Sequence, residues 1–328
     1  MIYLRGINAP DMKWKFSNSM SRPVRRRSLG TLLGAAVAFL CGMSEFCAAE
    51  VQKGDTSRIV AIGGAVTEIL FALGLGDRVV AVDQTSRYPA AASRKPDVGY
   101  SRALSPEGVL SIGPSLILAA EGAGPRSTLD VLEQASVPVV LIPEAHDKAG
   151  VLAKIAAVAQ AVGEQEKGRV LAAEVAADFA ALEDMVKALP SRPRAVFVLS
   201  ASGGAAVVGG SDTSADAIFR LACVTNAMAA IKGFKPALDE AAMSAEPDAV
   251  VVMKGGGQVL DADTVFSLPA FAGTPAARER RLVTMPGSFL LGFGPRTPRA
   301  ARDLAAALHP GARLPELPPR QWAAEKDQ

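Results

Sequence analysis

Tyr100 and Arg102 are the residues whose types and spacing best suit ligand chemistry in this chain. They lie two positions apart in a short segment, residues 98–104, just before a predicted helix. A tyrosine has an ordinary pKa of about 10, so it binds Fe(III) as phenolate only when a neighbour stabilises the anion, and the Arg102 guanidinium can do so. The alternative is a partly buried loop tyrosine with an arginine stacked on its ring. The residues alone leave both interpretations open.

Other reactive side chains are scarce. The chain has only two histidines, His146 and His309, and three cysteines. A His/Cys zinc site or a Ser-His-Asp triad would therefore have few residues to draw on. The glycine pairs near predicted strand ends match neither the dinucleotide fingerprint nor a phosphate-binding loop. We therefore do not expect an enzyme.

The first 49 residues have the features of an export signal. Three arginines at 25–27 precede an uncharged apolar run, residues 29–43, which is too short to span a bilayer comfortably. The small residues Ala48 and Ala49 then offer a cleavage site. The pattern predicts export, and it leaves the true start, the route and the cleavage position open.

Net charge argues against a nucleic-acid partner. The whole chain carries +2, and its first 49 residues hold seven basic and two acidic side chains, so the remainder carries −3. Proteins that bind nucleic acid are usually strongly basic. Removing the same segment leaves Cys223 as the single cysteine, which excludes an internal disulfide. No later stretch is apolar for long enough to suggest a transmembrane helix.

Beyond the signal, short β-branched runs alternate with helical patterns, as expected for buried parallel strands in an α/β fold. Residues 50–146 form a predicted first lobe, with strands at 59–62, 79–82, 116–119 and 137–142. Residues 191–310 repeat the pattern, with strands at 195–199, 250–253 and 282–284. We predict two doubly wound lobes, followed by a loose tail over residues 311–328.

Residues 147–190 connect the predicted lobes and differ from both. They are rich in Ala, Glu, Lys and Val at helical spacing, with Gly163 as the main interruption and Pro190 at the end. A helix of nearly this whole length would measure about 60 Å. We expect a spine helix that joins the lobes and restricts hinge motion between them.

Two acidic residues mark the lobes as pseudo-repeats. Glu107 stands seven positions before Pro114 and a predicted strand, and Glu240 stands seven positions before Pro247 and another. A helix dipole favours an acid in the first turn by about 0.3–1 kcal/mol, so a purely local explanation also exists.

Three motifs carry a family resemblance: residues 58–60 with 67–70, residues 99–110, and residues 291–298. Over residues 58–310 the chain resembles the periplasmic haem-binding proteins of bacterial haem-uptake ABC transporters, within a class that also carries siderophores and cobalamin. The resemblance implies the two-lobed class III binding-protein fold. It also implies that Tyr100 is the iron ligand and that Arg102 contacts it.

The resemblance assigns further roles. Glu107 and Glu240 fall where the wider class presents acids to arginines of the membrane permease. Lys254, at a predicted strand end, is a weaker candidate for pairing with a haem propionate. Some family members add a histidine ligand from the second lobe, but here residues 200–202 read Ser-Ala-Ser, so we assign no second ligand.

We therefore expect an exported, monomeric periplasmic protein that holds haem as cargo between its lobes and passes it to an ABC importer. The nearest rival is the same fold carrying a ferric siderophore or cobalamin. A rival of another class is an α/β enzyme that uses a bound nucleotide or metal, which would show turnover or a nucleotide-dependent thermal shift.

Overall fold

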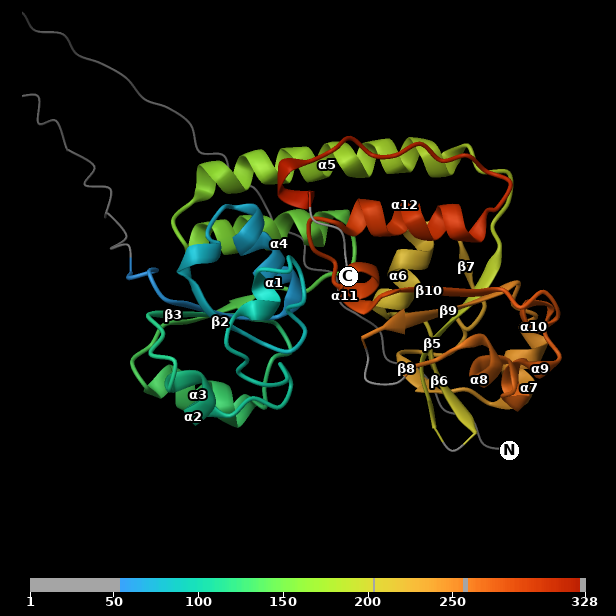
Figure 1. Ribbon diagram of the computed structural model, residues 1–328, viewed down its shortest axis with the longest axis horizontal. Coiled ribbons are helices and arrows are strands. Elements are labelled where there is room, and N and C mark those ends of the chain that lie inside the picture. Colours follow the sequence, from blue (N-terminus) through green and yellow to red (C-terminus); the bar gives the residue numbers. More distant parts are fainter. Residues whose placement is uncertain (1–53, 203, 256–258, 325–328) are drawn as a thin grey trace, which may run out of the picture. The chain divides into compact units, whose positions relative to one another are not determined.

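The computed structural model describes residues 54–202, 204–255 and 259–324 (Figure 1). The predicted export signal and the two N-terminal cysteines lie outside these residues. Within the described ranges, none of the helices is long and apolar enough to cross a membrane.

The first lobe contains a four-stranded, fully parallel sheet in the order β2-β1-β3-β4. Its strands are β1 (Ile59–Ile62), β2 (Val79–Val82), β3 (Leu116–Ala120) and β4 (Val139–Ile142). Its helices are α1 (Gly64–Ala72), α2 (Pro106–Leu110) and α3 (Arg126–Gln134), with 3-10 turns η1 (Gly76–Arg78) and η2 (Ala92–Arg94). The four predicted strands are confirmed. Strands β1, β2 and β3 are almost wholly buried, as their apolar runs predict, whereas the edge strand β4 is only partly buried.

The second lobe repeats this arrangement and adds to it. Its strands are β5 (Arg194–Ser202), β6 (Ala205–Gly209), β7 (Thr225–Asn226), β8 (Phe234–Pro236), β9 (Ala249–Lys254) and β10 (Leu282–Pro286). The parallel part, β10-β9-β5-β7, matches β4-β3-β1-β2 of the first lobe. The addition is antiparallel: β6 pairs with β5 and with β8. The sequence predicted only a turn after residue 199, whereas β5 continues to Ser202 and enters this hairpin.

Short helices cover the second sheet. They are α6 (Ser214–Leu221), α7 (Asp239–Ser244), α8 (Ala262–Phe266), α9 (Pro269–Ala272), α10 (Pro275–Arg278), α11 (Gly287–Leu291) and α12 (Thr297–Leu308). The α/β class and the two-lobed plan predicted from the sequence are therefore confirmed.

The expectation of one helix over nearly all of residues 147–190 is wrong. The segment forms α4 (Lys148–Ala161) and α5 (Gln165–Lys187), separated by a turn at Gly163 with φ 72°. Glycine adopts this left-handed conformation without steric cost. The helices pack closely where Gly168 meets Ala159, since a Cβ on Gly168 would lie 2.3 Å from the Ala159 Cβ. The connection between the lobes is thus α5, 23 residues and about 35 Å long.

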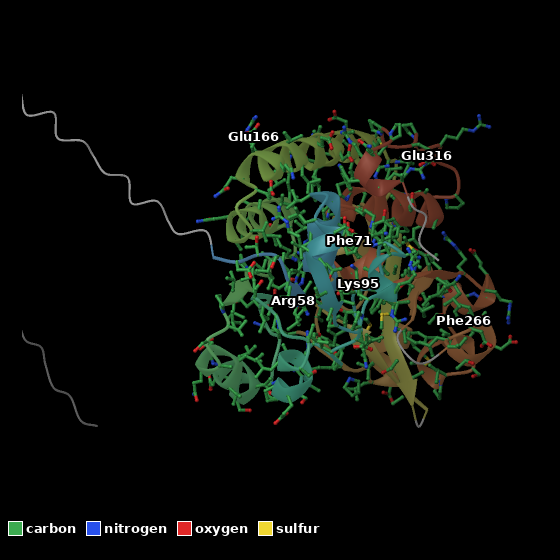
Figure 2. The ribbon with its side chains drawn as sticks, turned by 60° about the vertical axis from the view of Figure 1, so that its left-hand side comes forward. Arg58, Phe71, Lys95, Glu166, Phe266 and Glu316 are labelled. Atoms are coloured by element: carbon green, nitrogen blue, oxygen red, sulfur yellow. The ribbon has the colours of Figure 1, made fainter. Side chains whose placement is uncertain are left out.

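Three hydrophobic clusters fill the described chain. One lies on a single face of the first sheet and another on a single face of the second, and the third combines residues of both lobes with α4, α5 and α12. Figure 2 labels Phe71, at the rim of the shared cluster, and Phe266, inside the second-lobe cluster. All three lie within the compact unit that starts at Glu50. This unit has its own core, so we expect residues 50–328 to fold on their own.

The C-terminal segment is packed, so the expected loose tail is wrong for residues 311–324. Leu317 is buried, and η3 (Gln321–Ala323) lies close to α1. Arg320 Nη2 lies 2.7 Å from the Asp178 carboxylate on α5, and Trp322 Nε1 donates to Glu174 Oε2 at 2.6 Å. The segment therefore crosses from α12 over α5 toward the first lobe.

Candidate functional site

The carboxyl end of β2 is organised by one buried acid, Asp83. Its Oδ1 accepts from the backbone N–H of Gly63 at 2.8 Å and from Ser86 Oγ at 2.6 Å. Its Oδ2 accepts from the backbone N–H and the hydroxyl of Thr85, at 3.0 and 2.6 Å. Asp83 thus ties the β1–α1 turn to the loop after β2. Sequence reasoning missed this residue, although an acid directly after a buried strand and before Thr-Ser was visible in the sequence.

The loop that begins at Asp83 returns to β2 and presents Tyr100. Val98 N–H donates to the Val82 carbonyl at 2.9 Å, and Gln84 N–H donates to the Gly99 carbonyl at 3.0 Å. Gly99 has φ 98°, which favours glycine, and its N–H donates to Asp97 Oδ1 at 2.6 Å. The backbone just before Tyr100 is therefore fixed to the end of the sheet.

Residues beyond Tyr100 are fixed to the next strand connection. Ala103 N–H donates to the Tyr100 carbonyl at 2.8 Å, and Gly124 N–H donates to the Ser101 carbonyl at 2.9 Å. Leu104 is buried, whereas Tyr100 is 47% exposed. In open α/β sheets, ligands bind at loops beyond the carboxyl ends of the strands. The structure thus holds an exposed phenol on a well-supported loop at such an end.

Arg102 is exposed on the same loop. Among the described residues, no hydrogen bond joins its guanidinium to the Tyr100 hydroxyl. The structure therefore brings the two side chains into one loop and leaves both accessible to a ligand. Their predicted roles stay predictions.

Glu107 and Glu240 occupy equivalent places in the two lobes. Each is exposed in the first turn of a short helix, α2 or α7, nine residues before the first residue of β3 or β9. Hydrogen bonds from its own backbone N–H and from the Ser105 hydroxyl lower the pKa of Glu107, so this acid stays ionised at neutral pH. The repeat seen in the sequence is thus present in the fold.

Lys254 is the last residue of β9, exposed and paired with Pro286 of β10. Residues 256–258, which follow it, lie outside the described part of the chain. Lys254 and Tyr100 stand on different lobes, each beside the carboxyl end of a parallel strand. That placement is compatible with the role the sequence gave Lys254.

His146 lies just before α4 and contacts the second lobe. Its ring packs edge-on against Phe293, with the ring centroids 4.9 Å apart. Burial is the main cause that lowers the pKa of His146. Its imidazole is therefore neutral at pH 7 and serves the contact between the lobes.

Comparison with known proteins identifies the family. The model of a family described as "Periplasmic binding protein" matches residues 59–288, well over half of the chain. The chain belongs to the periplasmic binding protein family. The matched range covers both sheets and α5, so family membership rests on the two-lobed body as a whole.

Solved members of the periplasmic binding protein class align along nearly their full length. The periplasmic haem-binding protein BhuT, solved with two haems, is 41% identical with a TM-score of 0.73, over 77% of this chain and 98% of that one. The periplasmic haem-binding protein RhuT from Roseiflexus sp. RS-1, solved in its apo form, is 36% identical with a TM-score of 0.75, over 79% and 100%.

Curated sequence relatives are also binding proteins of transport systems. An uncharacterised ABC transporter substrate-binding lipoprotein, YvrC of Bacillus subtilis, is 26% identical over 79% of this chain and 82% of its own length. A vitamin B12-binding protein of Yersinia pestis is 34% identical over 89 residues, which cover 27% of this chain and about a third, 32%, of that protein.

Proposed function

We propose that this periplasmic binding protein is exported, binds haem as cargo and delivers it to an ABC importer in the inner membrane. The observation that carries the proposal is Tyr100, an exposed phenol on a loop held by backbone hydrogen bonds at the carboxyl end of the first sheet. The haem-binding names of two solved relatives, at 41% and 36% identity, support the same ligand.

Tyr100 has the chemistry that ferric haem requires of a protein ligand. A phenolate oxygen is an established axial ligand of haem iron. Arg102 follows on the same exposed loop, where its positive charge would support a phenolate bound to iron. Lys254, on the other lobe, supplies an ammonium group for a propionate. Haem would then lie between the strand ends of the two lobes.

Delivery would use the two exposed acids. Glu107 and Glu240 stand at matching places of a two-fold pseudo-repeat and are exposed, so they suit a permease with matching positive side chains. No bond of the cargo is made or broken in this role, and the chain would act as a carrier rather than an enzyme. The arginine-led apolar run near the N-terminus would direct it to the periplasm.

Haemin titration tests the ligand and its coordination in one experiment. Residues 50–328 are titrated with haemin and followed by absorption, alongside Tyr100→Phe. The control is Ser101→Ala, which removes a hydroxyl from the next residue of the same loop and leaves the phenol in place. We expect a saturable ferric spectrum with a phenolate charge-transfer band in the wild type and the control. Tyr100→Phe should lose that band and bind about tenfold more weakly or worse, a change of ~1.4 kcal/mol.

Two results would change the assignment. Retention of the charge-transfer band in Tyr100→Phe would exclude Tyr100 as the iron ligand. Failure of the wild type to bind haemin would exclude haem as the cargo. Cobalamin would then be the ligand to titrate, because the partial match to a vitamin B12-binding protein favours it next.

A further inference from the structure

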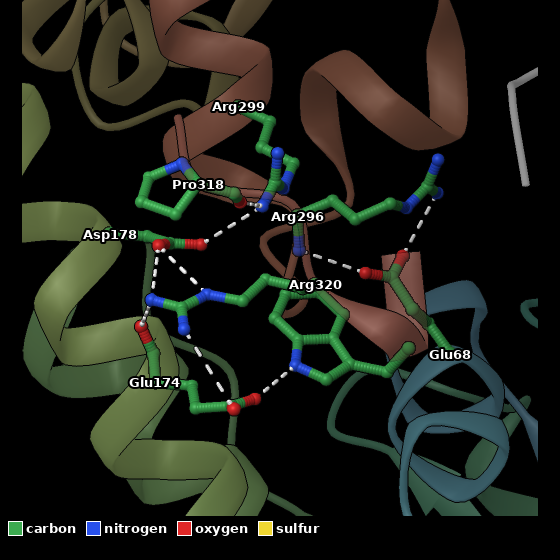
Figure 3. A network of polar contacts seen from close by, with 8 residues as sticks. Glu68, Glu174, Asp178, Arg296, Arg299, Pro318 and Arg320 are labelled. Atoms are coloured by element: carbon green, nitrogen blue, oxygen red, sulfur yellow. Dashed lines mark hydrogen bonds and ion pairs between the residues drawn. The ribbon is translucent and has the colours of Figure 1, made fainter. Parts of the chain in front are cut away.

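Two motifs that the proposed function leaves without a role meet in the structure. Glu68, from the segment 67–70, lies on α1 of the first lobe, and Arg296, from the segment 291–298, precedes α12 of the second. Both side chains are almost fully buried, 6% and 4% exposed. The Arg296 backbone N–H donates to Glu68 Oε1 at 2.9 Å, and its Nη2 donates to Glu68 Oε2 at 2.9 Å (Figure 3).

Tyr88 completes the contact. The Arg296 guanidinium carbon lies 3.3 Å from the centroid of the Tyr88 ring, and Tyr88 is 4% exposed. Arginine stacked on an aromatic face gains a cation–π attraction that grows when the pair is desolvated. Tyr88 belongs to the segment between β2 and Tyr100. We refer to Glu68, Tyr88 and Arg296 together as the clasp.

The first lobe holds the same second-lobe segment at another point. Lys154 on α4 is fully buried, pairs with Glu144 at 2.8 Å and donates to the Phe293 carbonyl at 3.2 Å. Between the two points lies Gly294, where a Cβ would come within 3.2–3.3 Å of the Glu68 carboxylate. The lack of a side chain at Gly294 lets the carboxylate approach this backbone.

A contact of this kind resists opening. If the lobes separated or slid at the clasp, Glu68 and Arg296 would lose the two hydrogen bonds between them, and Arg296 would lose its contact with the Tyr88 ring. An unpaired buried charge is strongly disfavoured, so arrangements with the pair broken are sparsely populated unless water replaces the partner. The clasp therefore favours one spacing of the lobes.

We infer that Arg296 is a positioning residue that holds the second lobe against Glu68 and Tyr88, and so sets the lobe spacing at the Tyr100 loop before any ligand binds. The link to haem binding rests on the proposed function, whereas the fixed spacing does not. The binding site would then be formed before the ligand arrives, and ligand binding would not need to bring the two lobes together.

Distance measurement between the lobes tests this inference. Spin labels are attached at Gln134→Cys on α3 and Thr264→Cys on α8, both exposed positions, in residues 50–328 with Cys223→Ser. We expect a narrow distance distribution without ligand that haemin leaves unchanged. In Arg296→Met the ligand-free distribution should broaden, and haemin should bind several-fold more weakly.

Matched variants separate positioning from general loss of stability. Arg220→Met breaks an ion pair with buried Asp216 inside the second lobe, and it should lower the melting temperature without broadening the distribution. Glu68→Gln keeps one of the two acceptors, its carbonyl oxygen, and loses the charge. The width of its ligand-free distribution should therefore fall between those of wild type and Glu68→Ala. If Arg296→Met does not fold, Glu68→Gln and the milder Gly294→Ala serve the same comparison.

Two outcomes would overturn the inference: a broad ligand-free distribution in the wild type, or a folded Arg296→Met with the wild-type distribution. Failure of the wild type to bind haemin would instead count against the proposed cargo. The ligand-free distances would still decide the role of the clasp.

Discussion

The charged and phenolic side chains discussed above form two sets, one exposed to solvent and one buried. Tyr100 and Arg102 are exposed and available to a ligand, whereas Glu68, Lys154 and Asp178 are buried and bonded to other parts of the chain. Burying a charge without a partner costs far more than leaving it in water. The buried set therefore maintains the fold, whereas the exposed set is accessible to a ligand.

At the residue scale, Arg102→Gln tests electrostatic support of Tyr100. The variant removes a positive charge two positions from Tyr100, so a phenolate bound to iron would lose electrostatic support. Haemin should bind this variant several-fold more weakly than wild type, with the charge-transfer band still present at saturation. A haemin titration followed by absorption measures the change. Arg87→Gln, an exposed arginine of the segment leading to Tyr100, is the control and should leave the haemin affinity unchanged.

The residues of the site could be predicted only as far as their types and order allowed. Tyr100 and Arg102 were proposed because they lie two positions apart and belong to one motif. The pairing of Glu68 with Arg296 was missed, because partners 228 residues apart in the chain are brought together only by packing of the lobes. No local pattern encodes that contact.

The boundaries of helices and strands could likewise be predicted only where a local sequence pattern determines them. Strands with β-branched runs were predicted correctly, since burial on both faces leaves a plain apolar pattern. Gly163 was recognised as an interruption, but the helix was expected to continue through it. Ala-rich helical patterns lie on both sides of Gly163, and one glycine is compatible with a helix interior at a cost of about 1 kcal/mol. The packed tail was missed because it has no periodicity and is held by polar contacts to α5.

At the element scale, Gly168→Ala tests the packing of α4 on α5. An alanine normally improves a helix interior by about 1 kcal/mol over glycine. Here its methyl group would lie 2.3 Å from the Ala159 Cβ, so the helices must separate, and we expect a loss of roughly 1–3 kcal/mol in unfolding free energy.

Gly108→Ala in α2 is the matched control, because its nearest neighbour would be 3.6 Å away, an ordinary contact. Denaturant unfolding of both variants measures the difference. The packing argument would be wrong if Gly168→Ala were as stable as Gly108→Ala.

The C-terminal segment gives a second prediction at this scale. Arg320→Ala removes two hydrogen bonds to Asp178, which is 1% exposed, and leaves that acid with Arg299 at 3.4 Å (Figure 3). We expect the free energy of unfolding to fall by roughly 2 kcal/mol. This is less than for a fully buried ion pair, because Arg320 is partly exposed and Arg299 still contacts Asp178. Glu316→Gln, on the same segment but largely exposed, should change the melting temperature little. Equal melting temperatures for the two variants would contradict the packed tail.

At the scale of the whole molecule, the lobes share one hydrophobic cluster that also includes α4, α5 and α12. Neither lobe can lose its structure without exposing part of that cluster. We therefore expect a single cooperative unfolding transition in calorimetry, with equal calorimetric and van't Hoff enthalpies. Two resolved transitions would show that the lobes are independent.

The pseudo-repeat gives a prediction about delivery. Glu107→Lys and Glu240→Lys should each impair haem-dependent growth through the cognate importer, and the double variant should do so more strongly, while haemin affinity stays unchanged. Glu133→Lys, an exposed acid on α3, is the charge-matched control. Normal growth with the double variant would exclude these acids from docking.

The clasp also has a consequence for the order of synthesis. Glu68 is made early, and its partner Arg296 follows 228 residues later. Until then Glu68 lacks this partner, whereas the sheet of the first lobe is already complete. We therefore expect the contact between the lobes at the clasp to form only after nearly the whole polypeptide has been made.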